Sequence, residues 1–352
     1  MRSLRLSDAA SALTAGEGVM THVRTAAYFS AFLGALGVTL IHFPWRRALS
    51  TRPATLCCFP YALCALCLTW RLILLFMLDF EAAYGTHEDP PNLFVEAYAL
   101  VCDSAAGWWW SCMLLGWVTV ACPVVAREAA RRGMPAWLAV AHVVAAFLGA
   151  VSLAFPIFFA HLLLLGTPRG NPTADGGQTK ASRMWIGCVG LSLVSIAALP
   201  ATVSRARALF IAALIVVHFV LLIPFGVRAH PRARLTGSLT RREFVALALL
   251  TFLLHIHASW AAYTEVSAHG HTGSLRSFAA ALVGAVTRNV CQASISIDAG
   301  MASAAGFVYM VERSGVRALW LCLLAPIISP AAALALHEVL AVDGAARPHL
   351  KV

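Results

Sequence analysis

Asp298 lies in a stretch of small and apolar residues, 291–312, and is the strongest single candidate for chemistry in this chain. A carboxyl group at membrane depth is costly unless it is paired or hydrated, so it marks a functional site by default. The alternative is a structural Asp298 that joins two helices by hydrogen bonds. On a helix, six residues fall within about 40° of one line and predict a polar stripe facing the interior of a bundle: Cys291, Ser294, Asp298, Ala305, Tyr309 and Glu312.

Glu96 is the second acid of interest. Asn92 is the expected N-cap of a helix that continues into the tryptophan triplet 108–110. Offsets of seven and fourteen residues place Glu96, Asp103 and Trp110 on one face of that helix. A carboxylic acid beside aromatic walls is poorly solvated when charged and can stay protonated, as a general acid requires. The alternative is an acid that complements the helix dipole, beside an interfacial tryptophan belt.

Arg71 is the third unusual residue, because it lies inside an apolar run that ends at Asp79. It is too far from the start of that run to be a simple end anchor. As a buried cation it could bind an anionic or oxygenated ligand, or keep a nearby carboxylate ionised. The alternatives are a side chain that reaches the interface and a structural ion pair.

Several kinds of site are absent from the sequence. There is no H-E-x-x-H, P-loop, G-x-S-x-G or dinucleotide-binding pattern, and no aspartate-rich cluster to hold magnesium and a diphosphate. His255 and His257 are about 200° apart on a helix and cannot bind one metal together. Cys64 and Cys67 match C-x-x-C, but they lie inside an apolar helix without a second pair, where cysteine serves as a small hydrophobe. We therefore expect no metal and no organic cofactor.

The elements that must position these residues are membrane helices. The chain has 352 residues, of which 60% are hydrophobic and 12% charged, and its mean hydropathy is +0.77. A soluble domain has roughly 45–50% apolar and about 25% charged residues. These values exclude an ordinary soluble enzyme and predict an all-α, polytopic transmembrane bundle of eight or nine spans. The spans are expected at 25–43, 55–79, 98–124, 136–166, 184–203, 207–227, 243–264, 291–311 and 316–340, with a less regular apolar piece at 277–287.

We expect one transmembrane domain at 25–340, between a polar segment at 1–24 and a polar tail at 341–352. The first helix would act as its own insertion signal. With nine alternating spans, Lys and Arg divide 12 to 13 between the two sides, so the positive-inside rule selects neither. The stretch 79–105 has no Lys or Arg and several acids, which favours the non-cytoplasmic side. The expected location is the endoplasmic reticulum or another endomembrane.

The charge pattern also limits the partners. The net charge of +10 comes from Lys and Arg scattered between apolar stretches, as in loops beside anionic lipid, rather than from one dense basic block. We expect membrane lipid and a lipophilic small molecule as partners, with no nucleic acid and no obligate protein partner. Isolated acids in an aromatic-lined apolar cavity suit protonation of an epoxide or alkene, followed by passage of a cation along aromatic faces.

Two stretches of the chain resemble a known family. Residues 93–101 (LFVEAYALV) followed by 108–111 (WWWS), and 294–298 (SISID) with Glu312 and Arg313, are similar to the integral-membrane terpene cyclases and related proteins of fungal meroterpenoid pathways, including the ascochlorin and ascofuranone type. In the better-known branch of that family, one acid near an early helix and one Asp near a late helix protonate a terminal epoxide on a farnesyl chain. The resemblance implies these roles for Glu96 and Asp298. It covers about a third of the chain.

The leading hypothesis is a membrane-bound terpene cyclase that protonates an epoxidised or olefinic prenyl chain on an aromatic precursor. Asp298 and Glu96 are its candidate catalytic residues. The alternatives are a proton-coupled small-molecule transporter, a membrane isomerase of a lipophilic substrate such as a sterol or carotenoid, and a non-catalytic scaffold. The candidate supporting residues are Arg71, Asp103 and Glu312, and the candidate cavity walls are Trp108, Trp109, Trp110 and Tyr309.

Overall fold

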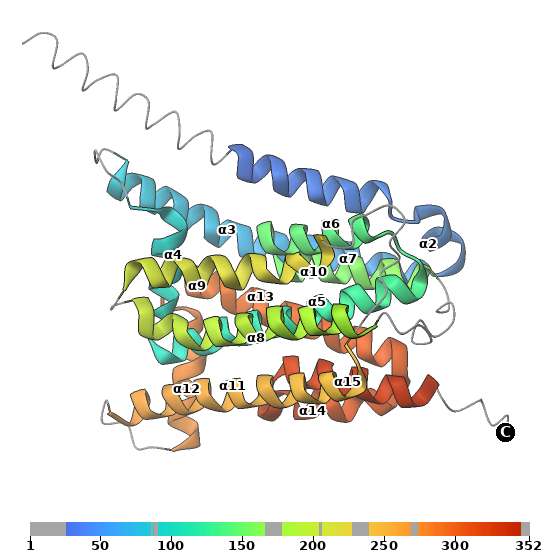
Figure 1. The fold of residues 1–352 in the computed structure, drawn as a ribbon. Helices are drawn as coiled ribbons and strands as arrows, with labels where there is room; N and C mark the ends of the chain where they lie inside the picture. The colour runs from blue at the N-terminus through green and yellow to red at the C-terminus, as the bar shows by residue number, and fades with distance from the viewer. Residues whose placement is uncertain are drawn as a thin grey trace, which may run out of the picture.

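A computed structural model describes residues 26–85, 87, 91–165, 178–203, 206–226, 239–268 and 274–345. All regular secondary structure within these residues is helical (Figure 1), which confirms the predicted all-α class. The predicted N-terminal segment at 1–24 and most of the tail predicted at 341–352 lie outside the described residues.

Long helices form the frame of the bundle, and shorter ones pack between and beside them. The helices of more than 20 residues are α3 (Cys58–Tyr84), α5 (Ala105–Arg132), α8 (Gln178–Val203), α11 (Arg241–Ala268) and α13 (Val290–Ser314). The shorter helices and turns are α2 (Trp45–Thr51), η1 (Pro53–Cys57), α4 (Leu93–Cys102), α6 (Ala136–Leu148), α7 (Val151–Leu164), α9 (Arg207–Phe219), η3 (Val220–Leu222), α10 (Ile223–Gly226), α12 (Leu275–Val286), η4 (Gly315–Ala318), α14 (Leu319–Ile328) and α15 (Pro330–Ala345).

Six helical stretches within the described residues are long and apolar enough to cross a membrane, and the bent pair Ala26–Ile41 and Trp45–Thr51 makes a possible seventh. The eight or nine spans expected from the sequence are not confirmed. Two of the expected spans, 136–166 and 316–340, each contain two short helices joined by a tight turn. Hydropathy alone does not separate one long apolar helix from two short ones.

The first of these pairs, α6 and α7, forms a hairpin. A link of two residues, Gly149 and Ala150, joins the helices, which pack against each other. Their outer ends lie together, because the Arg132 guanidinium just before α6 donates to Leu162 O near the end of α7 at 2.7 Å. A helix of 13 or 14 residues is about 20 Å long, which is less than the roughly 30 Å of the hydrocarbon core. The hairpin therefore turns inside the bundle.

The second pair, α14 and α15, also forms a hairpin whose outer end contacts a neighbouring long helix. Its turn is at Ser329, which has φ = 85° and whose hydroxyl caps α15 by accepting from Ala332 N at 3.0 Å. The turn packs beside Met113 and Gly116, near the middle of α5. The outer half of α15 contacts the end of α13, where Ser314 Oγ lies 2.8 Å from His337 Nε2. Both hairpins thus enter from the same end of the bundle.

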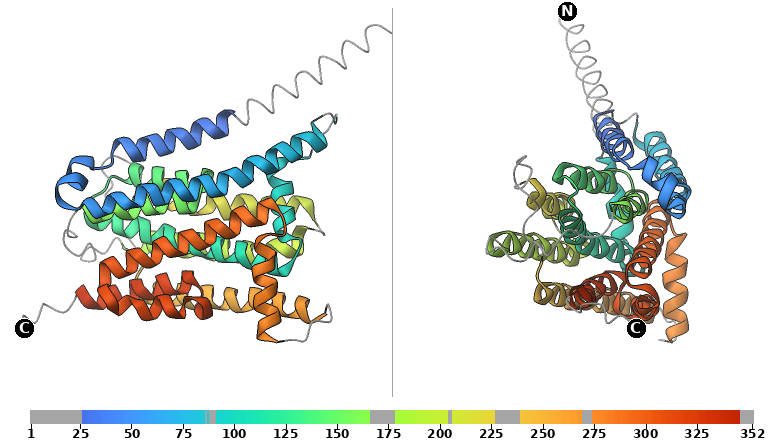
Figure 2. Two further views of the ribbon diagram at one scale, coloured as in Figure 1. Left: turned by 180° about the vertical axis from the view of Figure 1, so that it is seen from behind. Right: turned by 90° about the vertical axis from the view of Figure 1, so that its right-hand side faces the viewer.

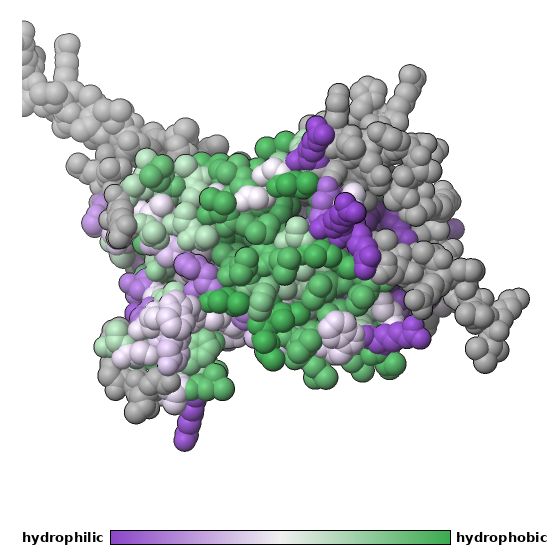
Figure 3. Space-filling view, turned by 60° about the horizontal axis from the view of Figure 1, so that its bottom comes forward, coloured by the Kyte–Doolittle hydropathy of each residue, from purple (hydrophilic) through white to green (hydrophobic). Residues whose placement is uncertain are grey.

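The helix α5 is the central element, and 89% of its most apolar 18 residues are buried. It packs against α11, α13, α15 and α8, as the end-on view in Figure 2 shows. By contrast, only 22% of the most apolar 18 residues are buried in the outer stretch Ala54–Tyr84, which contains α3. The outer surface carries exposed leucines, isoleucines and valines, and a hydrophobic band lies between hydrophilic residues at the two ends (Figure 3). The surface is that of a protein with lipid around its middle.

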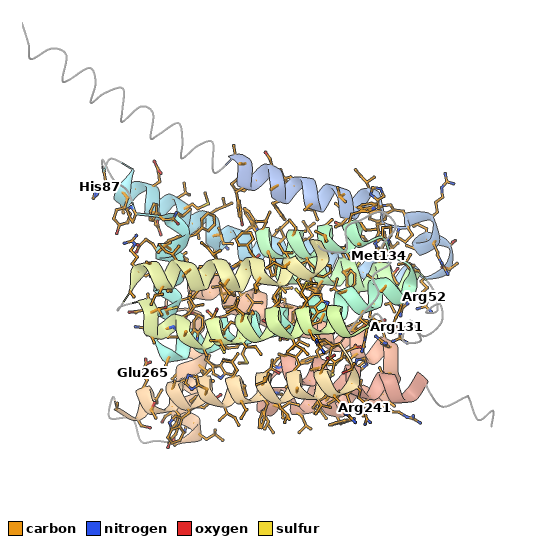
Figure 4. All side chains as sticks on the ribbon, viewed as in Figure 1. Arg52, His87, Arg131, Met134, Arg241 and Glu265 are labelled. Atoms are coloured by element: carbon orange, nitrogen blue, oxygen red, sulfur yellow. The ribbon has the colours of Figure 1, made fainter. Side chains whose placement is uncertain are left out.

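The two ends of the bundle differ in charge (Figure 4). We call the end with Arg52, Arg131 and Arg241 the basic end, and the end with His87 and Glu265 the acidic end. Both hairpins enter from the basic end. The count over nine spans divided Lys and Arg evenly between the two sides of the membrane because it treated 136–166 as one crossing. In the structure 136–166 is a hairpin that enters and leaves at the same end, so every loop after it lies on the opposite side from the one assumed in that count. Further arginines at the basic end are Arg46, Arg47, Arg127, Arg132, Arg242 and Arg313, whereas the acidic end has Asp79, Glu81, Glu96 and Asp103.

Gly149 allows the turn of the first hairpin, and its substitution tests that turn. A Cβ on Gly149 would lie 2.1 Å from Phe32 Cε2 and 2.7 Å from Ala145 O. We expect Gly149→Ala to lower the free energy of unfolding by about 1–3 kcal/mol through overpacking. A Cβ on Gly190 of α8 would meet nothing within 4 Å, so Gly190→Ala should be neutral or stabilising by up to about 1 kcal/mol. Thermal unfolding in detergent measures both, and equal effects would contradict the hairpin geometry.

Candidate functional site

Asp298 lies on α13 at the tip of the first hairpin and is 8% exposed. Its Oδ1 accepts a hydrogen bond from Ser152 N at 2.7 Å, and its Oδ2 accepts one from Val151 N at 3.2 Å. These amides begin α7, whose N-cap residue, Ala150, has no side chain that can cap the helix. Asp298 therefore caps α7 from another helix, and satisfies amides that would otherwise be unpaired inside the bundle.

Aromatic side chains hold the two carbonyl groups on the other side of the turn. Trp70 Nε1 donates to Gly149 O at 2.9 Å, and the Tyr28 hydroxyl donates to Leu148 O. Phe32 stacks on Trp70 with ring centroids 5.3 Å apart. The turn is thus fixed by three separate elements: the helix at 26–41, α3 and α13.

Two tyrosines and a serine complete the surroundings of the carboxylate. Tyr61 of α3 donates to Met301 O at 2.6 Å, and both Tyr61 and Tyr98 lie within electrostatic range of Asp298. Ser152 is fully buried, and its hydroxyl lies within reach of the Asp298 carboxyl group. We call Tyr61, Trp70, Tyr98, Ser152 and Asp298 the hairpin-tip site. The site therefore places a buried hydroxyl group beside a buried acid.

Tyr98 of α4 is joined to a histidine. Its hydroxyl lies 2.6 Å from His218 Nε2, and His218 Nδ1 lies 2.7 Å from Leu214 O. A carbonyl oxygen can only accept, so Nδ1 carries a proton and the neutral ring accepts the Tyr98 proton at Nε2. The hydrogen bond joins α4 to α9 in the bundle interior.

Two features of the arrangement favour the anionic form of Asp298, whereas its burial disfavours that form. Two backbone amides point at its oxygens, and the positive end of the α7 dipole lies beside it. A fixed anion of this kind can accept a proton or stabilise a nearby positive charge without reorganisation. The structural alternative considered for Asp298, a hydrogen-bonded link between two helices, is therefore present in the structure. It does not conflict with a chemical role.

Glu96 lies apart from this arrangement, at the acidic end. Asn92 caps α4 as predicted, its Oδ1 accepting from Phe94 N and Val95 N at 3.1 and 3.2 Å. The Glu96 side chain is 33% exposed and forms an ion pair with Arg207 at 3.6 Å. The Glu96 carboxylate is thus half-buried beside an arginine and is not enclosed in an apolar pocket.

The prediction of one continuous helix from Asn92 through the tryptophans is wrong. The helix that begins after Asn92 is α4. It ends at Cys102, and Ser104 caps a new helix, α5, by accepting from Gly107 N at 3.1 Å. Asp103 is consequently not on a face with Glu96 and Trp110. It forms an exposed ion pair with Arg288 at 3.0 Å. Ser104 is a strong N-cap residue, and this signal in the sequence marks the break.

The four aromatic residues predicted to line one cavity do not lie together. Each packs against a different part of the bundle. Trp108 is buried in the main core. Trp109 Nε1 donates to Ser259 Oγ of α11, and Trp110 Nε1 donates to Leu282 O of α12, both at 2.9 Å. Tyr309 stacks on Phe159 at 4.3 Å and bonds to Arg313 at the basic end.

Two of the predicted supporting residues are exposed. Arg71 is exposed on α3 and makes no ion pair with a described residue, so the expected buried cation is not found. Glu312 is exposed as well, although the other members of its predicted stripe, including Ser294 and Asp298, face the interior. The stripe is thus confirmed except at its last residue.

The densest group of buried charges was not expected from the sequence. Glu128 of α5 is fully buried and lies within 4 Å of four guanidinium groups, those of Arg127, Arg131, Arg132 and Arg313. Glu338 of α15 is also fully buried and contacts Arg127, Arg313 and His337. We call these four arginines and two glutamates the arginine cluster. In the sequence, the charged residues at the end of α5 look like an anchor at the membrane interface. Only Glu338, which lies in an apolar stretch, could have indicated that the group is buried.

Two pockets are formed elsewhere in the bundle. One, of about 330 Å³, opens at the acidic end between α5, α11 and α12, where Glu265 and Arg288 line it. The other is a small hollow at the Ser329 turn. Neither is lined by Asp298 or Glu96. Within the described residues, no three His, Cys, Asp or Glu side chains are grouped as metal ligands.

The chain matches no protein-family model, no curated protein and no solved structure.

The capping role of Asp298 can be tested by stability. Asp298→Ala leaves two buried amides without partners and should lower the free energy of unfolding by about 2–5 kcal/mol. Asp298→Asn keeps one acceptor oxygen and should cost about half of that or less. Denaturation of the purified protein in detergent measures the difference. Equal losses for the two variants would show that Asp298 does not cap α7.

Proposed function

We propose that this chain is a polytopic membrane enzyme of the terpene-cyclase type, which acts on a lipophilic prenylated substrate with Asp298 as its central catalytic residue. One observation carries the proposal: a single carboxylate is fixed inside an apolar bundle, with aromatic side chains and a buried hydroxyl around it. The sequence resemblance of 93–101 and 294–298 to membrane terpene cyclases favours the same chemistry.

The proposed reaction needs one proton and one stabilised cation. A proton added to the oxygen of a terminal epoxide opens the carbon–oxygen bond and leaves a tertiary carbocation. An alkene of the same chain attacks this cation, a carbon–carbon bond forms, and loss of a proton ends the sequence. A fixed anion lowers the energy of the cation, and aromatic faces such as those of Tyr61 and Trp70 add to the effect.

The geometry favours a division of roles. Asp298 accepts two amide hydrogen bonds as an anion, so it suits stabilisation of the cation and removal of the final proton. Tyr98, whose hydroxyl bonds to His218 Nε2, is the candidate proton donor, and the proton that the final cation releases to Asp298 would restore it. Glu96 remains a candidate acid only if its pairing with Arg207 opens.

A lipophilic substrate would reach the site from the bilayer. The helix α3 carries Tyr61 and Trp70 and has most of its surface outside the packed core. Substrates of this kind partition into lipid, so lateral access between helices requires no water-filled channel.

A membrane preparation supplied with an epoxidised prenyl arene tests this function, with the cyclised product measured by mass spectrometry. Asp298→Asn should lower turnover about 100-fold or more, and Tyr98→Phe should do so by a similar factor, as for loss of acid–base groups. Glu96→Gln is the control and should retain most activity. Unchanged cyclisation by a chain carrying both Asp298→Asn and Glu96→Gln would refute the mechanism.

A second candidate function, proton-coupled transport, is favoured by the two half-length hairpins. Discontinuous helices whose ends meet charged groups near the middle of the membrane are typical of transporters. Uptake by proteoliposomes that depends on Asp298, with no conversion of the substrate, would favour this function. Product formation in detergent, where no gradient exists, would favour the enzyme.

We also propose that the chain crosses an endomembrane several times with its basic end in the cytoplasm. Most arginines lie at the basic end, and two of the arginines at the acidic end, Arg207 and Arg288, are each paired with an acid. Cytoplasmic ends of membrane proteins carry the excess of Lys and Arg.

This orientation makes a prediction for glycosylation. A flexible insert with an Asn-Gly-Thr acceptor, placed in the connector at 269–273, should be glycosylated in microsomes of the endoplasmic reticulum. The same insert at 227–238 should not be, because that connector joins helices at the basic end. A gel shift reports the result. Modification of the second insert alone would reverse the orientation.

A further inference from the structure

The arginine cluster contains more positive than negative charge. Its described side chains are four guanidinium groups, which are always protonated, and two carboxylates. The side chains of Arg127, Glu128 and Glu338 are 4%, 0% and 0% exposed. Even with both glutamates ionised, a net charge of about +2 is held largely out of water. Such a charge is costly to bury unless an anion compensates it.

Arg127 is the residue with unused hydrogen-bonding capacity. It contacts Glu338, lies 3.5 Å from Glu128 through Nε, and stands over the Phe244 ring at 4.6 Å. Its Nη1 is buried and has no hydrogen-bond partner among the described atoms, and Arg131 Nε is in the same condition. Guanidinium donors of this kind match the oxygens of a phosphate group, which can accept from several arginines at once.

The position of the cluster fits a ligand from the membrane surface. It joins the basic-end parts of α5, α13 and α15, beside the start of α11. A phosphate at this depth lies where phospholipid headgroups meet the protein, and basic pockets between membrane helices bind such headgroups. Soluble phosphates from the aqueous side would meet the same donors.

We propose that the arginine cluster is a phosphate-binding site, in which Arg127 and Arg131 hold a phosphate group of an anionic phospholipid or of a soluble phosphate. This site is separate from the hairpin-tip site, and its ligand takes no part in the reaction proposed there. Its ligand completes the charge balance between α5, α13 and α15, and so ties the second hairpin to the frame of the bundle.

The test uses the full chain, purified in a non-ionic detergent. One arm measures the thermal unfolding of delipidated protein with inorganic phosphate, against sodium chloride of equal ionic strength. The other arm measures the phospholipid that co-purifies, by mass spectrometry of the intact protein. Stabilisation by phosphate identifies a site open to soluble ligands, and retained anionic lipid identifies the headgroup as the ligand.

Four variants make the result specific. Arg127→Gln and Arg131→Gln should each weaken ligand binding about tenfold or more, the effect of losing a charge-assisted hydrogen bond. Arg46→Gln is the matched control, since it removes one exposed arginine from α2 at the same end and should bind as the parent does. Glu338→Gln removes a competing carboxylate and should strengthen binding, whereas a purely structural ion pair predicts no ligand and lower stability.

Two results would overturn the proposal. One is a parent protein that neither retains anionic lipid nor is stabilised by phosphate above the chloride control. The other is binding that changes equally in Arg131→Gln and Arg46→Gln. If Arg127→Gln does not fold, the other two variants still test the proposal. Arg131→Gln is expected to weaken ligand binding and Glu338→Gln to strengthen it.

Discussion

The constraint on which this structure depends is that backbone amides inside an apolar bundle must find partners. The helix α7 begins in the interior, where no water is available to its first amides. Asp298 supplies the acceptors from α13, while Trp70 and Tyr28 satisfy the carbonyl groups at the end of α6. Without these three side chains the turn at Gly149 would leave several polar groups buried and unpaired. The hairpin therefore exists because residues far apart in the chain complete it.

The same constraint shapes the chemistry available at this turn. A carboxylate that caps a helix is held in one place, and its anionic form is a good partner for a developing cation. In the proposed reaction, proton delivery falls to a separate group, Tyr98 of the neighbouring helix α4, which bonds to His218 of α9. The capping role of Asp298 and its proposed catalytic role are thus compatible, and a substitution is expected to affect both. For this reason the loss of activity and the loss of stability have to be compared between Asn and Ala at the same position.

Local features of the structure were predictable from the sequence, and long-range ones were not. The apolar stretches identified the helical class, the spacing of Ser294 and Asp298 identified the buried face of α13, and Asn92 identified the start of α4. The break at Asp103 and Ser104 was missed because a tryptophan-rich stretch beyond it continues the helical pattern. The turn at Gly149 and Ala150 was missed because neither residue interrupts the hydropathy of 136–166. The partners of Asp298 and Glu128 come from elements far away in sequence, which no local spacing indicates.

The two polar groups of the bundle are linked by the way the hairpins are anchored. The first hairpin has its tip on an anion, Asp298, and its outer ends beside Arg132. The second has its outer half on the arginine cluster through Glu338. Since α13 carries both Asp298 and Arg313, a shift of this helix along its axis would strain the cap of α7 and the contacts of α15 together. A ligand that balances the charge of the cluster would therefore also steady the position of Asp298, because rigid helices transmit such a displacement over their whole length.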